Sequence, residues 1–217
     1  MRNVFVLVLL FCGSLILSAQ NKSSQFEQDL ELIGMTFSSS DRYNVSDNLE
    51  LVYITDDKNC PLRRLKMVHA ILENRDGQCD IFVYISGANG LRYGGLVKTN
   101  KGLFGEISSL TYNRIKSNFQ YSRPNSSASE QDIEDLKMMM TFYPHDTARS
   151  LFNADYMMVY PFNMEGKKYQ DKFTRTRVIV TGKDGLDVFL YFAMTDEGIK
   201  NFDKYLMDFK GVFLFSK

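Results

Sequence analysis

The sequence KFTRTRVIVTGKDGLDVFLYFAM, from Lys172 to Met194, carries the strongest signal for the fold. Two strands are predicted here, over 172–181 and 186–194, and the turn sequence Gly-Lys-Asp-Gly joins them. Positions 188–193 are apolar without interruption, which is typical of a strand that is covered on both faces of its sheet. This stretch therefore predicts two joined strands, the second of which is covered on both faces.

A second hairpin is predicted upstream, with arms at 65–73 and 79–86 and a turn at 74–77. In this register three apolar residues of the first arm share one face with three of the second, as period-2 burial requires. The facing pairs are Val68 with Ile85, Ala70 with Val83, and Leu72 with Ile81. Asn89-Gly90 tolerates the positive φ of a tight turn. A third strand over 91–98, ended by 100–102, would then complete an antiparallel meander.

The rest of the chain alternates between strand and helix signals. A helix over 129–143 is expected to begin at Ser129 and to stop at Pro144, and a last helix from 195 is followed by Gly211 at its end. Residues 26–33 fit either a short helix or a strand. The remaining expectations are strands at 35–37, 49–55, 156–162 and 212–215, a helix at 104–118, a helical turn at 146–152, and polar loops at 38–48 and 122–129.

Together these elements predict an α+β fold, with an antiparallel or mixed β-sheet and helices packed on it. We expect one domain over 20–217, because an apolar terminal strand needs a larger sheet to join. The loop at 122–129 is the one place where the chain could be divided. With 44% apolar residues, the chain can bury a core of ordinary size.

The first twenty residues predict export. Arg2 supplies a positive charge, residues 4–17 form an apolar run, and Ser18-Ala19-Gln20 offers small residues to signal peptidase. That run is shorter than the ~20 residues of a membrane-spanning helix. We therefore expect residues 1–19 to be removed, leaving a periplasmic or secreted chain without a membrane span. An uncleaved membrane anchor is the alternative.

Charge and histidine content exclude several kinds of site. The chain has 26 basic and 26 acidic residues, so the basic excess typical of nucleic-acid binding is absent. Its two histidines, His69 and His145, have no further Cys or His at ligand spacing, and we expect no metal or other cofactor. We expect His69 to be a half-exposed sheet residue and His145 to lie at a helix start.

No set of residues forms a catalytic motif. Ser86 precedes Gly87, but Tyr84 and Ala88 occupy the two glycine places of a nucleophile elbow. The glycines at 87, 90, 94 and 95 are flanked by predicted strands rather than by a helix, so turns explain them better than a phosphate cradle does. We therefore expect a protein that is not an enzyme.

Cys60 and Cys79 are the two cysteines outside the signal sequence. An exported protein can form a disulfide. The predicted hairpin, however, places Cys79 near its turn, opposite Asn74, and Cys60 beyond the far end of the other arm. Two Cα atoms more than about 7 Å apart cannot be bridged. We expect two separate thiols, with Cys79 on the buried face, and keep a disulfide or redox role as the alternative.

Part of the sequence resembles a known family. Tyr143-Pro144, Ala148-Arg149, Phe152-Asn153-Ala154-Asp155 and Tyr160 are similar to a block in uncharacterised secreted proteins of Gram-negative bacteria. Those proteins resemble the PsbP-like α/β/α sandwich in outline. The resemblance implies a non-catalytic assembly or binding role and carries no catalytic residues. The proline-glycine turn expected after the opening strand is replaced here by Ser38-Ser39-Ser40-Asp41.

Methionines suggest one candidate binding surface, namely a ligand groove lined by Met138, Met139, Met157 and Met158. Methionine adapts its shape to varied apolar partners. Ordinary core packing is the alternative, and apolar stripes at helical spacing favour it.

The expected function is thus an exported, non-enzymatic binding or assembly module, whose partner is a protein or an apolar small molecule. A small periplasmic hydrolase, with acid and base residues that meet only in the fold, is the alternative.

Overall fold

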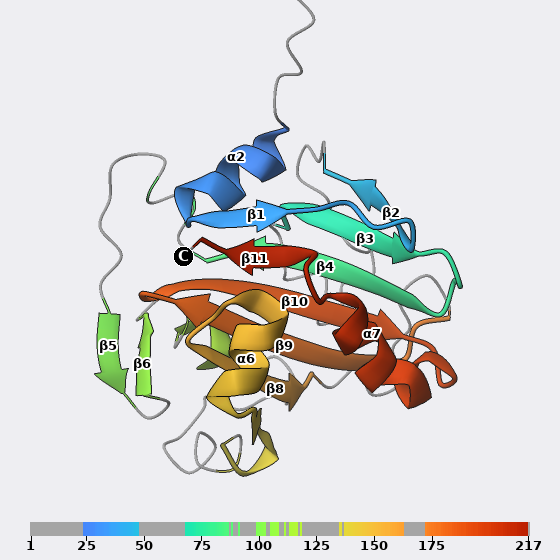
Figure 1. The fold of residues 1–217 in the computed structure, drawn as a ribbon. Coiled ribbons are helices and arrows are strands. Elements are labelled where there is room, and N and C mark those ends of the chain that lie inside the picture. The colour runs from blue at the N-terminus through green and yellow to red at the C-terminus, as the bar shows by residue number, and fades with distance from the viewer. Residues whose placement is uncertain are drawn as a thin grey trace, which may run out of the picture.

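The computed structural model describes residues 24–47, 68–86, 99–102, 105–108, 137–162 and 172–216, with single residues or short pieces at 88, 91, 111, 113–116, 118 and 135. The fold is α+β, as predicted (Figure 1). Its helices are α2 (Gln25–Leu32), α6 (His145–Phe152) and α7 (Phe202–Asp208), with a 3-10 turn, η2 (Gly198–Asn201). Its strands are β1 (Met35–Phe37), β2 (Tyr43–Ser46), β3 (Ala70–Asn74), β4 (Cys79–Ile85), β5 (Thr99–Gly102), β6 (Gly105–Ser108), β7 (Thr141–Phe142), β8 (Tyr156–Pro161), β9 (Arg175–Lys183), β10 (Leu186–Met194) and β11 (Phe213–Phe215).

A seven-stranded sheet forms the centre, in the order β2-β3-β4-β10-β9-β8-β7, and every pairing in it is antiparallel. The predicted hairpin at its centre is confirmed: β9 and β10 pair from Lys183↔Leu186 to Arg175↔Met194. The turn itself is only Asp184-Gly185, at φ +52° and +76°. Positive φ at both central residues is what a two-residue type I′ hairpin needs.

Both faces of β10 are covered, as its unbroken apolar sequence predicts. Every residue from Val188 to Met194 is 0% exposed. Alternate residues serve two cores: Leu190 belongs to the first core and Tyr191 to the second. In Figure 1, α2, α6, α7 and the pair β1–β11 lie on the near side of the sheet, over the first core. Ile115, from the helical residues of 111–118, and Met140 lie over the second.

The C-terminal strand was expected to join the large sheet, but it does not. β11 pairs instead with β1 in a separate two-stranded sheet, from Met35↔Phe215 to Phe37↔Phe213. The Phe213 ring contacts three other rings, with centroids 5.0 Å away at Phe37, 5.6 Å at Phe209 and 6.3 Å at Phe26. Burial of aromatic surface rather than a place in a larger sheet therefore holds this strand.

The β3–β4 hairpin has the predicted register, with Ala70↔Val83 and Leu72↔Ile81. The prediction for Val68 was wrong. Residue 69 lies outside the strand, and Val68 packs in the second core while Ala70 and Leu72 pack in the first. The alternation expected along this arm therefore begins only at Ala70.

The predicted meander continues differently. Ala88 and Leu91 are helical, so no strand begins at 91, and β10 occupies the place beside β4. A distant strand that is apolar on both faces thus takes the place beside β4 that the meander predicted for a local strand. The meander was expected to end at residues 100–102. Residues 99–102 instead form the strand β5, which pairs with β6.

Other expectations need correction at their boundaries. The predicted loop at 38–48 contains β2. Residues 105–108 of the predicted helix at 104–118 form the strand β6 instead, and the described helical residues of that stretch lie within 111–118. The helix expected up to Tyr143 ends at Met139, because 141–142 pair with β8 as β7. Gly211 has the expected positive φ, +82°, but lies two residues after the cap Phe209.

Two further predictions concern short helices, and three others concern segments outside the described residues. Residues 26–33, left open between helix and strand, form α2, which starts with a capping box between Ser24 and Glu27. The helical turn at 146–152 is α6. The signal sequence at 1–19, the strand at 49–55 and the loop at 122–129 lie outside the described residues. No helix within the described ranges is long and apolar enough to cross a membrane.

Candidate functional site on the second face of the sheet

The polar groups of the interior gather on the second face of the sheet, opposite α6 and α7. They arise by alternation, because strand residues two apart share a face. The strands contribute Tyr84 from β4, Tyr156 and Tyr160 from β8, and Asp187 and Tyr191 from β10, and Ser86 follows directly after β4. Helical residues 111, 114 and 118 face them, at the spacing of one helix side.

Asp187 is the buried acid at one end of this face, with 0% exposure. Its two carboxylate oxygens accept hydrogen bonds from the hydroxyls of Thr111 and Tyr156. Ser86 completes the group: its Oγ lies 3.3 Å from Thr111 Oγ1, and its N–H donates to the Asp187 carbonyl at 2.9 Å. Burial and the neighbouring carboxylate raise the pKa of Tyr156 well above its ordinary value, so the phenol stays a donor.

Gly182 makes room for this group. A Cβ at this position would lie 2.6 Å from the Tyr156 hydroxyl and would also collide with the Asp187 carboxylate. Because real Cβ atoms do not approach so closely, the glycine permits the contact between tyrosine and aspartate. The group is therefore tightly packed around a carboxylate whose oxygens are already occupied.

Asn118 organises the middle of the face. Its Nδ2 donates to the hydroxyl of Tyr160 at 2.7 Å and to that of Tyr191 at 2.9 Å. All three residues are at most 1% exposed. Burial raises the pKa of Tyr160 and of Tyr191 far above the ordinary range, so both phenols keep their protons.

Arg114 lies over the Tyr84 ring, with its guanidinium carbon 3.9 Å from the ring centroid. Tyr84 in turn packs edge-on against Phe189, at 5.9 Å, and against His69, at 5.5 Å. A guanidinium over an aromatic face is attracted by the ring quadrupole. The Tyr84 ring, supported by these neighbouring rings, therefore holds the positively charged guanidinium of Arg114 on this face.

His69 is more buried than predicted, since its side chain is 9% exposed. Its Nδ1 accepts the Ile85 N–H at 3.1 Å, and its Nε2 lies 4.0 Å from Asp29 Oδ2 on α2. The histidine thus connects α2 to the end of β4. The half-exposed position expected for a mid-strand residue was wrong because His69 precedes β3.

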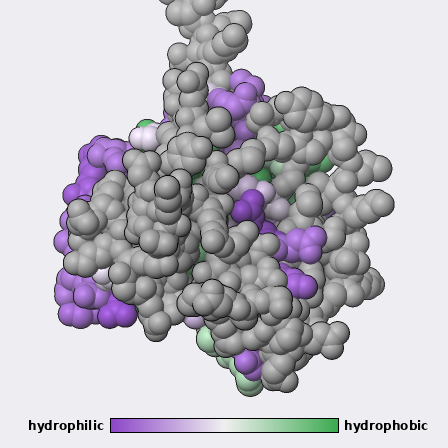
Figure 2. Space-filling view, turned by 180° about the vertical axis from the view of Figure 1, so that it is seen from behind, coloured by the Kyte–Doolittle hydropathy of each residue, from purple (hydrophilic) through white to green (hydrophobic). Residues whose placement is uncertain are grey.

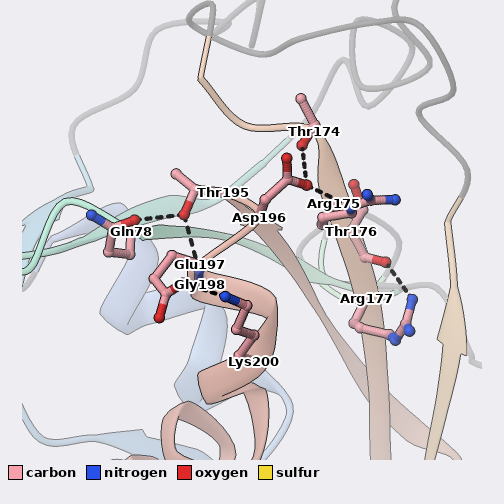
Figure 3. Close-up of polar contacts among 10 residues, drawn as sticks. All are labelled: Gln78, Thr174, Arg175, Thr176, Arg177, Thr195, Asp196, Glu197, Gly198 and Lys200. Carbon is pink, nitrogen blue, oxygen red and sulfur yellow. Dashed lines mark hydrogen bonds and ion pairs between the residues drawn. The ribbon is translucent and has the colours of Figure 1, made fainter.

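A second polar group lies where β9 begins and β10 ends, at the far end of the hairpin from its turn (Figure 3). Thr195 donates to Gln78 at 2.5 Å and accepts the Gly198 N–H at 2.9 Å, which begins the 3-10 turn. Asp196 accepts from Thr174 and Arg175, at 3.2 and 2.7 Å. The side chains of Arg175 and Asp196 are more than half exposed, so this group does not form an enclosed site.

The four methionines predicted to line a groove do not meet. Met157 and Met158 are each 1% exposed and belong to opposite cores, because adjacent strand residues point to opposite faces. Met138 and Met139 are 78% and 45% exposed. The core-packing alternative therefore holds for the second pair, and a binding role stays a prediction for the first.

Cys79 is a free, fully buried thiol, and burial raises its pKa well above the ordinary value. Cys60 lies outside the described residues, so two separate thiols remain a prediction. His145, at the start of α6 as expected, is more than half exposed, with Nδ1 4.0 Å from Asp146 Oδ1. No group of three metal-ligating side chains occurs in the part of the chain that the structure describes.

Comparisons with known proteins give one similar structure. Neither a protein-family model nor a curated protein matches the sequence. The solution structure of cyanobacterial PsbP (CyanoP) from Synechocystis sp. PCC 6803 matches at a TM-score of 0.40 and 10% identity, over 86% of each chain. The matched protein carries the family name that the sequence resemblance indicated.

Sequence reasoning missed Arg114, Asn118 and Asp187. A signal was present: residues 111, 114 and 118 lie on one side of a helix, although all three are polar or charged. Considered alone, a polar side of a helix indicates exposure to solvent. Only the facing tyrosines show that it is buried.

Proposed function

We propose that the protein is an exported, non-enzymatic binding or assembly module whose partner is a protein. The observation that carries the proposal is an exposed apolar surface at Met138, Met139 and Phe142, here called the 138–142 surface. Their side chains are 78%, 45% and 49% exposed. Export rests on the signal sequence expected at residues 1–19.

Apolar exposure is concentrated at this surface. Among the described residues, five large apolar side chains are exposed, and three of them lie within five positions of one another. The other two, Leu32 and Met207, lie singly on α2 and α7. Figure 2 shows a pale green, hydrophobic area at the lower end of the molecule. Clustered apolar exposure of this kind marks interaction sites.

The neighbouring backbone suits a protein partner. Phe142 belongs to β7, the last strand of the seven-stranded sheet, which pairs with β8 on one side. An edge strand presents N–H and C=O groups to which an extended segment of another protein can add. Apolar side chains beside that edge then supply the contact area.

A small-molecule groove has less support. Two cavities that the described residues line have volumes of about 280 and 220 Å³ and lie beside β1 and β11. None of the four candidate methionines lines either cavity. Typical ligand pockets are larger, about 300–1,000 Å³. A protein partner therefore explains the exposed methionines better than a small molecule does.

The interior polar groups support a role without catalysis. Both carboxylate oxygens of Asp187 are occupied by hydroxyl donors, so this acid does not serve as a base for Ser86. The Ser86 hydroxyl contacts Thr111 rather than a histidine. A nucleophile needs an adjacent base, and no contact among the described residues supplies one. Nothing in them favours the hydrolase alternative.

Site-specific crosslinking tests this function. A photo-reactive methionine analogue at position 138 should form one discrete protein adduct in the host cell. The same analogue at Met207, which is 56% exposed on α7, is the matched control and should form none. Phe142→Lys, which places a charge at the sheet edge, should reduce the adduct at least tenfold. An absent adduct, equal adducts at both positions, or an adduct unaffected by Phe142→Lys would contradict the proposal.

A further inference from the structure

Arg114 and the tyrosines around it form a second candidate site, separate from the 138–142 surface. We propose that this cluster binds an anionic group, a carboxylate or a phosphate, through the Arg114 guanidinium. Two observations support it: the position of the charge and the hydrogen-bond donors that surround it.

Arg114 has no anionic partner among the residues that the structure describes. Arg114 is half-buried, its guanidinium carbon lies 3.9 Å from the Tyr84 ring centroid, and Tyr84 is also its side-chain hydrogen-bond partner. No carboxylate among the described residues forms an ion pair with it. Asp187, the buried acid of the same sheet face, is already occupied by Thr111 and Tyr156. Removing a charge from water is unfavourable unless a counter-charge compensates it, so an anion would stabilise this arrangement.

Donors outnumber acceptors in the cluster. The hydroxyls of Tyr160 and Tyr191 both accept from Asn118 Nδ2, so each still has a proton to donate. Arg114 adds guanidinium N–H groups and no acceptor. A carboxylate and the ionised oxygens of a phosphate are acceptors only, and charge-assisted hydrogen bonds to such groups are the strong ones. The cluster therefore suits an anion better than a neutral or cationic group.

One atom of the cluster has no partner. Asn118 is 1% exposed, and its Oδ1 makes no hydrogen bond. Rotating the amide would exchange Oδ1 with Nδ2, and then the nitrogen would be left unpartnered. Buried polar atoms are normally satisfied. A singly protonated phosphate could donate a hydrogen bond to this oxygen, whereas a carboxylate could not, so this atom favours phosphate over a carboxylate.

The aromatic floor is rigid enough to orient the guanidinium. Tyr84 packs edge-on against Phe189 at 5.9 Å, and Phe189 stacks on Tyr191 at 6.0 Å. All three residues come from the central strands β4 and β10. A planar guanidinium on a fixed ring presents its N–H groups in one direction, which favours bidentate recognition of an anion.

Anion titration of the purified protein tests the proposal. Sodium acetate and sodium phosphate are added separately, with sodium chloride at equal ionic strength as the control, and the Arg114 Nε–Hε resonance is followed by NMR. Saturable shifts are expected with acetate, phosphate or both, and a linear response with chloride. Saturation with acetate alone indicates a carboxylate ligand, and saturation with phosphate alone indicates a phosphate. Linear responses to all three salts would overturn the proposal.

Matched variants separate binding from packing. Arg114→Lys keeps the charge but loses the planar set of guanidinium N–H donors, so we expect saturation at an anion concentration at least fivefold higher. This titration is followed through the amide resonances of neighbouring residues. Arg175→Gln removes a charge from the exposed end of β9 and should leave the titration unchanged. Met139→Lys should also leave it unchanged, so the two proposals can fail independently. If Arg175→Gln abolishes saturation, or Arg114→Lys leaves it unaltered, the site is not at Arg114.

Discussion

Asp80 shows how a single residue can make stability depend on pH. It lies on β4 opposite Ala193 and is 5% exposed. Burial, with a smaller contribution from the Glu73 carboxylate, raises its pKa from 3.8 to about 6, although Lys172 opposes the shift. The folded protein therefore binds this proton more tightly than the unfolded chain does.

We predict that Asp80→Asn stabilises the protein more at pH 7.5 than at pH 4. Because the folded pKa lies above the unfolded one, the contribution to stability is present below about pH 4 and is lost as the pH rises through 6. The shift corresponds to at most about 3 kcal/mol in the free energy of unfolding. Urea denaturation of both proteins at the two pH values measures the difference. An equal effect at both would contradict the prediction.

At the scale of elements, the two ends of the described chain stabilise each other. β1 follows α2, and β11 is the last strand, yet they form their own two-stranded sheet. Asn153, in the left-handed conformation after α6, donates its Nδ2 to the Phe215 carbonyl at 2.8 Å. The small sheet is thereby fastened to α6 as well as packed over the first core.

We predict that Phe213→Ala lowers the free energy of unfolding by about 3–5 kcal/mol, the usual range for removing a buried phenylalanine. The ring is 0% exposed and contacts Phe26, Phe37 and Phe209. Leu214→Ala, in the same strand but only half-buried, is the matched control and should change it by less than about 1.5 kcal/mol. Urea denaturation gives both values. Similar losses for the two variants would show that β11 is held by its backbone rather than by the Phe213 ring.

Elements also show where local patterns fail. The helix expected up to Tyr143 ends early because Thr141 and Phe142 find a partner strand in β8. That pairing joins residues from different predicted elements, so no local window contains it. The β3–β4 register was predictable because its two arms lie next to each other along the chain, and a short turn determines which residues face.

For the whole molecule, export and the state of the two thiols remain predictions. We expect the protein from its own host to begin at Gln20 and to react with two equivalents of an alkylating reagent when it is denatured without reductant. Cys79 is buried and free, so it should react only after denaturation. Intact-mass spectrometry reports both the start of the chain and the number of alkyl groups. A mass beginning at Met1, or no alkylation, would contradict one prediction or the other.

The sequence by itself determined the α+β class, the covered β9–β10 hairpin, the β3–β4 register and the short helix α6. Each depends on apolar periodicity and on turn residues within about 25 positions, which a chain displays before it folds. Only the tertiary structure decided that β10 lies beside β4, that β11 pairs with β1, and that Arg114, Asn118 and Asp187 share one buried face. Those contacts join residues far apart in the chain. Their partners are selected by burial and by hydrogen bonding in three dimensions, so no local pattern contains them.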